Sequence, residues 1–383
     1  MLALLLLVWP GLCRAQEETT EQESTKPPGV EETIDRVIEG LDFSQTEGLT
    51  VPGMEEAGIA EAVRRFASGE TVSVEALVSD VLSGLFAQLG SMGPLLLALM
   101  LPVLLLSILS HLLLGEDDAL AGLAHSACFV LLLIPMITLT IRELEHTRSA
   151  IVAMTMQMDK MLPLLLTLLT AVGGSASSAF FHPVVVAASG SMVYLAREVI
   201  LRLVMCTCAV TAVNHLSDRM HLTRMAQLLR SAVCWLLGVS FTVFLGAMSL
   251  QGVCSASVDG VAIRAAKYAV DNFVPVVGGM FSDTMDTLVG CTLIVKNALG
   301  VASVLVLCAL LLGPMLQTLA AVFALKLGAA LLEPVADGEV IRAIGDFSRT
   351  IVLFLITMLC VGTMYFLLIV QVLLVGNLTV MLR

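Results

Sequence analysis

The sequence predicts an all-α, polytopic integral membrane protein: a helical bundle of about seven to eight spans that follows a small helical extracytoplasmic segment. Its 383 residues are 58% hydrophobic and 14% charged, whereas an ordinary soluble domain carries about 25% charged residues. The apolar residues form long continuous runs rich in Leu, Val, Ala and Met, unlike the alternating segments of a β-barrel. A single soluble core cannot bury this much apolar surface, so the bulk of the chain belongs in lipid.

Residues 1–15 have the pattern of a secretory signal peptide. An apolar stretch over 2–12 is followed by the small residues Cys13 and Ala15, and a polar run begins at Gln16. No basic residue precedes the apolar stretch. An uncleaved short anchor is therefore the alternative interpretation.

Residues 16–93 form an acidic segment that the signal would place outside the cytoplasm. The segment holds sixteen acidic and four basic residues, which accounts for the whole net charge of −12. So negative a segment is not expected to bind nucleic acid or anionic lipid heads. Residues 16–29 have the composition of a disordered linker. The apolar periodicity that follows predicts amphipathic helices over 30–41, 59–66 and 74–89.

Residues 94–383 form the predicted transmembrane helical bundle. A spanning helix needs about 20 apolar residues, and polar breaks at 142–160, 214–230, 251–287 and 333–350 separate the apolar runs. The segments expected to span the membrane are 94–114, 122–141, 161–180, 183–213, 231–250, 288–312, 315–332 and 351–376.

The two signals for orientation disagree. A cleaved signal peptide places residues 16–93 outside, and counting the spans then leaves the basic breaks 142–160 and 214–230 outside as well. The positive-inside rule favours a cytoplasmic position for both breaks. One additional or one missing crossing before residue 142 would reconcile the signals, and we predict a secreted N-terminal segment.

The sequence contains none of the common catalytic constellations. It has no G-x-x-x-x-G-K-[ST] phosphate-binding loop and no H-E-x-x-H zinc motif. Its six histidines are not spaced with cysteines or carboxylates as metal ligands. We therefore expect no enzyme, no cofactor and no metal site.

Charges inside apolar spans are the candidate functional residues, because each is unfavourable in lipid unless it is paired or faces water. Arg197, Glu198 and Arg202 lie in the predicted fourth span, where Glu198 and Arg202 are spaced for an ion pair on one helix face. Two interpretations stay open for these charges, a polar lining of a pore or cavity and an internal packing core. The same holds for a second group, near the sixth span, which comprises Asp283, Asp286, Lys296 and Asn297.

Residues 267–300 are the most distinctive part of the sequence. Pro275 and the pair Gly278–Gly279 interrupt a helix there, and several Asp and Asn side chains make the stretch too polar to face lipid. Irregular backbone at membrane depth is tolerated only where it is buried in protein or lines water. The stretch is therefore either a re-entrant or interfacial element, or a surface loop between two spans.

The run NFVPVVGGMFSDTMD over residues 272–286, followed by KNALG over 296–300, resembles the stage III sporulation protein AE family. The general plan is similar as well, with a signal-like N-terminus, an acidic extracytoplasmic segment and a polytopic bundle that extends to the C-terminus. The resemblance covers most of the chain and is weakest toward the N-terminal end.

This resemblance implies an endospore-forming bacterium and a position in the mother-cell membrane that surrounds the forespore. It implies a subunit of a secretion-like channel complex that links the two cells and is needed for forespore development. The implied partners are the other proteins of the same operon, including a cytoplasmic secretion-type ATPase and ring-forming proteins of the intermembrane space, and a forespore-side channel partner. The family carries no established catalytic residues, so the resemblance implies none here.

Two other functions stay open on the sequence. One is a stand-alone secondary transporter of a small solute, with a midplane site near Lys296. The other is a structural scaffold that only anchors the extracytoplasmic ring. The missing phosphate-binding loop agrees with a channel subunit, because an ATPase partner would supply the energy.

Overall fold

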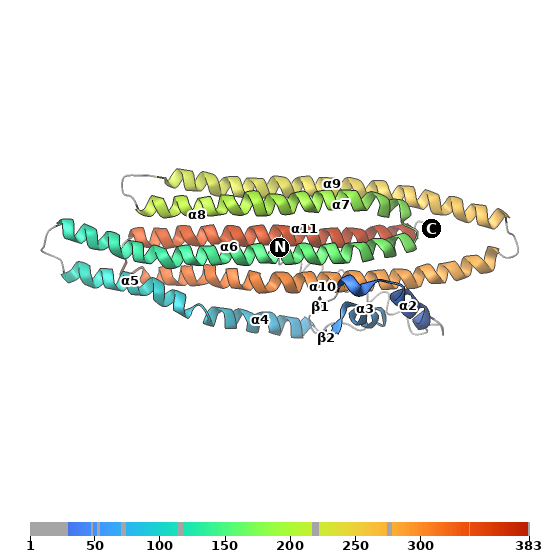
Figure 1. Cartoon of the computed structure of the whole chain (residues 1–383), viewed down its shortest axis with the longest axis horizontal. Helices are drawn as coiled ribbons and strands as arrows, with labels where there is room; N and C mark the ends of the chain where they lie inside the picture. The colour runs from blue at the N-terminus through green and yellow to red at the C-terminus, as the bar shows by residue number, and fades with distance from the viewer. Residues whose placement is uncertain are drawn as a thin grey trace.

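The computed structural model shows a bundle of long helices with a small unit attached to one side (Figure 1). The predicted signal peptide at 1–15 and the predicted linker at 16–29 lie outside the residues that it describes. The described residues are 30–46, 49–51, 54–69, 74–112, 118–216, 222–273, 278–336 and 338–381.

The long helices run back and forth along one axis (Figure 1), and they confirm the predicted all-α membrane class. The longest, α10, has 55 residues and therefore measures about 82 Å at 1.5 Å per residue. The hydrocarbon core of a bilayer is only about 30 Å thick, so such a helix extends well beyond it. The bundle comprises α5 Gly93–Leu112, α6 Asp118–Ala171, α7 Ser175–Tyr194, the π-helical turn η2 Leu195–Ile200, α8 Leu201–Leu216, α9 Thr223–Phe273, α10 Gly278–Leu332 and α11 Gly338–Met381.

Five stretches of the described chain are long and apolar enough to cross a membrane. Large apolar side chains on their outer faces, such as Leu101, Trp235 and Leu250, are exposed, as side chains that contact lipid are. The five stretches are Val81–Leu105, Ser177–Leu216, Thr223–Leu250, Thr287–Leu332 and Gly338–Asn377.

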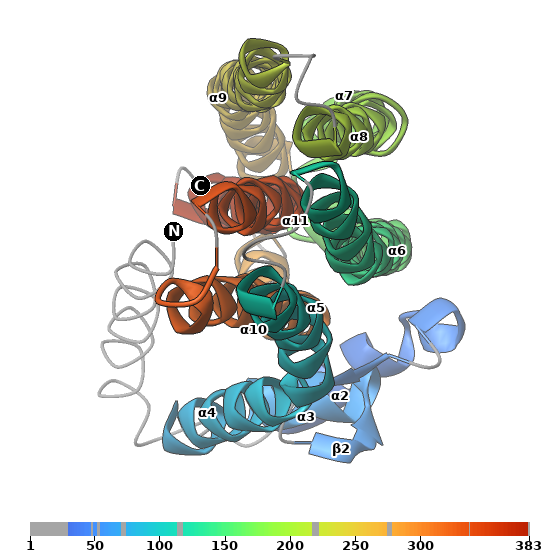
Figure 2. The same cartoon turned by 90° about the vertical axis from the view of Figure 1, so that its left-hand side faces the viewer.

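The bundle is layered when it is viewed along its axis (Figure 2). Helices α7, α8 and α9 form one layer, α6 and α11 form the middle layer, and α10 and α5 form the next. The closest association in the bundle joins α10, α11 and α6. These three helices therefore carry most of the core.

A small N-terminal unit precedes the bundle and packs along α10 (Figure 2). Its buried Ile34, Ile38, Val63 and Phe66 belong to the same apolar cluster as the core of the bundle. The helices of this unit match the predicted amphipathic stripes, while its short antiparallel hairpin has no counterpart in the prediction. The unit comprises α2 Val30–Glu39, the 3₁₀ turn η1 Phe43–Thr46, β1 Thr50–Val51, β2 Met54–Gly58, α3 Ile59–Ala67 and α4 Val74–Gly90.

The predicted polar break at 142–160 is wrong, because α6 continues through it. Arg142, Glu145 and Arg148 are exposed, and their spacing of three residues places them on one face of the helix. Arg and Glu are good helix formers. The charged residues of 142–160 therefore form a polar face of a continuous helix. The predicted spans 122–141 and 161–180 lie in this one helix, which ends at Ala171.

The predicted separation of two spans at Pro314 is also wrong, because α10 continues through this proline. The neighbouring Leu311 and Met315 are buried in the core, and their packing offsets the hydrogen bond that the proline removes. The distinctive stretch 267–300 is largely helical as well. It comprises the end of α9 and the start of α10, while residues 274–277 lie outside the described chain.

Candidate functional site

Buried polar groups are the candidate functional elements of this bundle, since a polar side chain among apolar helices needs a partner. Two groups of contacts stand out among the described residues. One surrounds Asp346 near the start of α11, and the other surrounds Lys296 in α10. Between them, α6 and α10 share further polar contacts.

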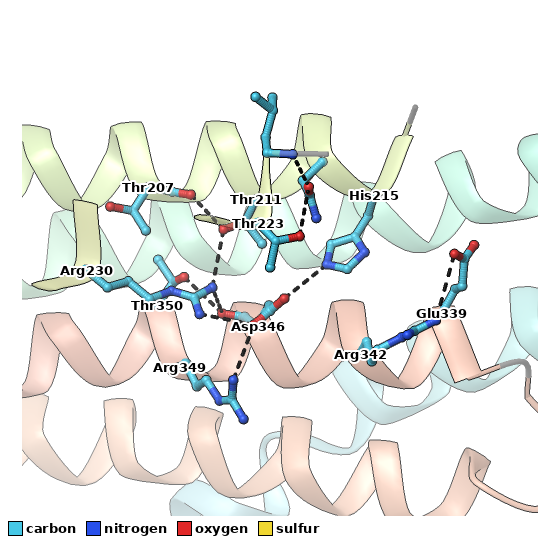
Figure 3. Close-up of polar contacts among 12 residues, drawn as sticks. Thr207, Thr211, His215, Thr223, Arg230, Glu339, Arg342, Asp346, Arg349 and Thr350 are labelled. Atoms are coloured by element: carbon cyan, nitrogen blue, oxygen red, sulfur yellow. Dashed lines mark hydrogen bonds and ion pairs between the residues drawn. The ribbon is translucent and has the colours of Figure 1, made fainter. Parts of the chain in front are cut away.

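Asp346 joins three helices (Figure 3). The Arg230 guanidinium, from α9, donates through Nη1 to Asp346 Oδ1 at 3.0 Å and through Nη2 to the Asp346 backbone oxygen at 3.0 Å. His215, near the end of α8, places Nε2 3.2 Å from Asp346 Oδ2. The carboxylate is therefore held from two sides by cationic or potentially cationic groups of other helices.

The Asp346 cluster is largely shielded from solvent. The side chains of His215, Arg230 and Asp346 are 12%, 14% and 20% exposed, whereas Arg349, at 3.6 Å from the same carboxylate, is 74% exposed. Shielding strengthens the Coulomb attraction and makes an unpaired member of the cluster costly. We therefore expect the Arg230–Asp346 pair to contribute far more than the outer Arg349–Asp346 pair.

Lys296 is fully buried between α10 and α11. Its Nζ donates to the Leu373 backbone oxygen at 2.9 Å and to Asn377 Oδ1 at 3.3 Å. The ammonium reaches α11 because position 376 is glycine: a Cβ atom there would collide with Nζ and lie 3.0 Å from Cε. A second close approach of the same helices occurs where Gly300 faces the Leu373 side chain, and small residues are the usual means of such contact in membranes.

The other predicted residues of this group do not gather around Lys296. Asp286 precedes it by ten residues on the same continuous helix, which separates the two positions by about 15 Å along the axis. Asp283 lies farther away still, and the side chains of both aspartates are outside the described ones. Asn297 is partly buried, and its Oδ1 has no hydrogen-bond partner among the described residues.

The predicted pairing of Glu198 with Arg202 is present: Arg202 Nη2 donates to Glu198 Oε2. The Arg202 side chain is 74% exposed, so the pair lies on the outside of the bundle. Arg197 and Glu198 belong to the π-helical turn η2, a local distortion that often marks functional positions. The turn η2 packs on α9 and α11. Among the described residues, no hydrogen bond or ion pair joins this group to Lys296, whose partners are Leu373 and Asn377.

A third set of polar contacts joins α6 to α10 within the break that the sequence predicted. Thr318 Oγ1 donates to the buried Glu143 Oε2 at 2.7 Å, and His146 Nδ1 contacts Gln317 Oε1. Farther along, Gln157 Nε2 donates to the Ser303 backbone oxygen at 2.7 Å. Three polar side chains of α6 thus bind partners on α10, while Glu143 Oε1 and Gln157 Oε1 have no hydrogen-bond partner among the described residues.

The sequence-based reasoning missed Asp346, His215, Arg230 and Glu143. The sequence predicts polar breaks at 142–160, 214–230 and 333–350, and charges inside such breaks are expected to face solvent. One signal was available: Arg230 directly precedes one apolar run and Asp346 lies shortly before another. Opposite charges at equivalent depths of two spans are candidates for an ion pair.

Long apolar helices joined by buried polar contacts define a multi-pass integral membrane protein. The chain belongs to the stage III sporulation protein AE family, which it matches over residues 58–376. Stage III sporulation protein AE of Bacillus subtilis (strain 168) is 30% identical over 368 residues, or 96% of this chain and 91% of the relative. No solved structure matches the chain.

The family confirms the resemblance that the motif at 272–286 suggested. It identifies the chain as a subunit of a sporulation complex and favours that reading over the stand-alone transporter. The family is one of sporulation proteins and carries no sign of catalysis.

Proposed function

We propose that this chain is a membrane subunit of a secretion-like channel complex that links mother cell and forespore and is needed for forespore development. It lies in the mother-cell membrane around the forespore. Its partners are a secretion-type ATPase on the cytoplasmic side, ring-forming proteins between the membranes, and a channel protein from the forespore side. Any transported material passes along this subunit or between copies and partners, not through the middle of α6, α10 and α11.

The burial of Lys296 is the observation that excludes a transport path through the middle of α6, α10 and α11. A lysine that lined an open pathway would be exposed to water, whereas Lys296 is 0% exposed and bound by α11. Exposed apolar side chains, which need contact with lipid or with another protein, lie on the outer faces of the bundle, for example Leu97, Val243 and Phe323. Lys296 and Asn297 therefore fit a packing core, and the outer faces fit lipid and neighbouring subunits.

Co-purification tests the channel role. A tagged chain expressed at its natural level in sporulating cells is expected to bring down the ATPase and the ring-forming proteins of the operon after mild detergent extraction. The same cells carrying a tag on an unrelated multi-pass protein serve as the control. A chain that purifies alone, takes up a small solute in liposomes and loses that uptake in Lys296→Ala would support the transporter and contradict the channel subunit.

The continuous course of α6 supports one orientation. The end of α5, the junction of α8 with α9 and the junction of α10 with α11 lie at one end of the bundle (Figure 1). Five basic residues lie toward this end. At the opposite end, Arg264 and Lys267 lie near the end of α9, and no Lys or Arg lies between Lys160 and Arg197 around the α6–α7 junction. The positive-inside rule therefore favours a cytoplasmic position for the first end. The basic residues at that end are Arg224, Arg230, Lys326, Arg342 and Arg349.

This orientation agrees with a secreted N-terminal segment. With 142–160 inside one helix, we count α6 as a crossing although it is not one of the five apolar stretches. The crossings before Leu222 are then the α4–α5 stretch, α6, and the continuous α7–η2–α8 helix. An N-terminal segment outside then places 214–230 in the cytoplasm. This count supports a secreted N-terminal segment together with a cytoplasmic 214–230, whereas the five apolar stretches alone would place 214–230 outside.

Reporter fusions test the orientation. Alkaline phosphatase fused after Gly173 is expected to be active, and the same enzyme fused after Leu222 is expected to be inactive, because it folds only outside the cytoplasm. A fluorescent reporter that matures only in the cytoplasm should give the opposite pattern. Activity of alkaline phosphatase at Leu222 alone would invert the orientation, and equal activity at both positions would show that the α7–α8 helix does not cross.

A further inference from the structure

A groove of about 400 Å³ lies between α10 and α11, on the side of the Asp346 cluster away from His215. Its walls combine two kinds of side chain. Leu325, Ala329 and Val352 are apolar, while Lys326, Ser348 and Arg349 are polar. A groove with this mixture suits a ligand that has both a charged head and an apolar body.

Both cations of the groove are available to an anion. Lys326 is exposed, and no acidic side chain of the described residues pairs with it. Arg349 is 74% exposed and approaches Asp346 only at 3.6 Å, while Asp346 already binds Arg230 at 3.0 Å (Figure 3). Most of the hydrogen-bonding capacity of the Arg349 guanidinium is thus unused. Glu333, seven residues after Lys326, lies about 10 Å farther along the helix axis.

Ser348 adds a second, independent feature. The residue is 2% exposed, and its hydroxyl has no hydrogen-bond partner among the described residues. Other hydroxyls of α11, those of Thr350 and Thr357, donate to the carbonyl oxygen four residues earlier, as hydroxyls in helices commonly do. A buried hydroxyl in the wall of a cationic groove is a donor that lacks an acceptor.

We infer that this groove binds the phosphate of an anionic phospholipid. Arg349 can donate two parallel hydrogen bonds to phosphate oxygens, and Lys326 supplies a point charge. Lys326 lies six residues before the end of α10, about 9 Å along the axis, so its flexible side chain can reach the headgroup level. The apolar wall then faces the first part of an acyl chain, which distinguishes a lipid from a free phosphate ion.

The level of the groove agrees with this ligand. It lies toward the end of the bundle that the basic residues place in the cytoplasm, and the cytoplasmic leaflet carries the anionic lipids. The inference depends on the membrane position of α10 and α11 and draws support from the proposed orientation, but it does not depend on the channel role. If the channel role is refuted, the lipid site is unaffected, and the reverse also holds.

Native mass spectrometry of the purified full chain in a mild detergent tests the site. Added phosphatidylglycerol is expected to give a bound peak at concentrations where phosphatidylcholine gives none. Lys326→Gln is expected to weaken phosphatidylglycerol binding about fivefold, which corresponds to about 1 kcal/mol for one cation, and Lys326→Gln with Arg349→Gln about 25-fold. Lys326 is exposed and has no ion pair with any residue in the described part of the chain, so its single variant is expected to fold normally.

Arg342→Gln is the matched control, because Arg342 lies near the same end of α11 with a side chain 71% exposed, and it does not line the groove. It should leave phosphatidylglycerol binding unchanged. Equal binding of the two lipids, or an unaltered affinity of the Lys326→Gln variant, would overturn the proposal. Displacement of phosphatidylglycerol by millimolar inorganic phosphate would overturn the lipid as the source and indicate a site for free phosphate.

Discussion

Replacing Asp346 with alanine is expected to lower the free energy of unfolding by about 2–4 kcal/mol, because it leaves the shielded Arg230 without its counter-charge. The substitution also removes the partner of His215. Three helices lose their common contact, and the ends of α8 and α9 should separate from α11. Unfolding in mild detergent, followed by the helical circular dichroism signal at increasing denaturant, measures the loss.

Arg349→Ala is the control for this substitution. It removes the outer ion pair of the same carboxylate, whose partner side chain is 74% exposed, and such a pair contributes about 0–1 kcal/mol. Replacing Asp346 and Arg230 together by Leu and Met should recover part of the lost stability, since neither charge is then left unpaired. Equal losses for Asp346→Ala and Arg349→Ala would mean that shielding does not strengthen the inner pair.

The class of fold follows from composition, but the helix boundaries do not. Long apolar runs are incompatible with water whatever their partners, so the membrane bundle could be predicted from the sequence. The position of a break depends on whether charges lie on one face or all around the helix. Arg142, Glu145 and Arg148 lie three residues apart and leave α6 intact. This spacing is visible in the sequence, but the mean hydropathy of a stretch of residues does not reflect it.

The candidate sites could be predicted only in part. Lys296 and the Glu198–Arg202 pair were recognisable because a charge within an apolar run is rare. Their surroundings were not, because the partners of Lys296 come from α11, 77 and 81 positions later in the chain. Asp346 meets Arg230 across 116 positions. Such pairings depend on which helices become neighbours in the fold, and the residues near each charge in the sequence do not indicate this.

Gly376→Ala is expected to have the second large effect. A Cβ atom at this position would collide with Lys296 Nζ, so the ammonium would leave the Leu373 carbonyl oxygen and stay buried without its acceptors. We expect a loss of about 2–4 kcal/mol in the free energy of unfolding, which exceeds the gain of about 1 kcal/mol from the better helix propensity of alanine. Gly345→Ala is the control, because a Cβ atom there meets nothing within 4 Å.

A double-mutant cycle identifies the cause of this loss. Lys296→Ala alone removes the long side chain and leaves a cavity, at a cost of about 2–4 kcal/mol, but it also removes the atoms that the added methyl group of Gly376→Ala would strike. The double variant is therefore expected to be more stable than the sum of the single effects by about 1–3 kcal/mol. Additive losses would show that Gly376 is required for backbone reasons unrelated to Lys296.

Substitutions of Lys296 distinguish a packing role of its side chain from a functional role of its positive charge. Lys296→Met retains most of the side-chain volume, and replacing a buried charge with an apolar side chain of similar size costs less than about 1.5 kcal/mol. If Lys296 acts through packing, Lys296→Met should sporulate normally while Lys296→Ala fails in proportion to its lower stability. Equal loss of heat-resistant spores in both variants, with normal amounts of folded protein, would instead show that the complex uses the positive charge itself.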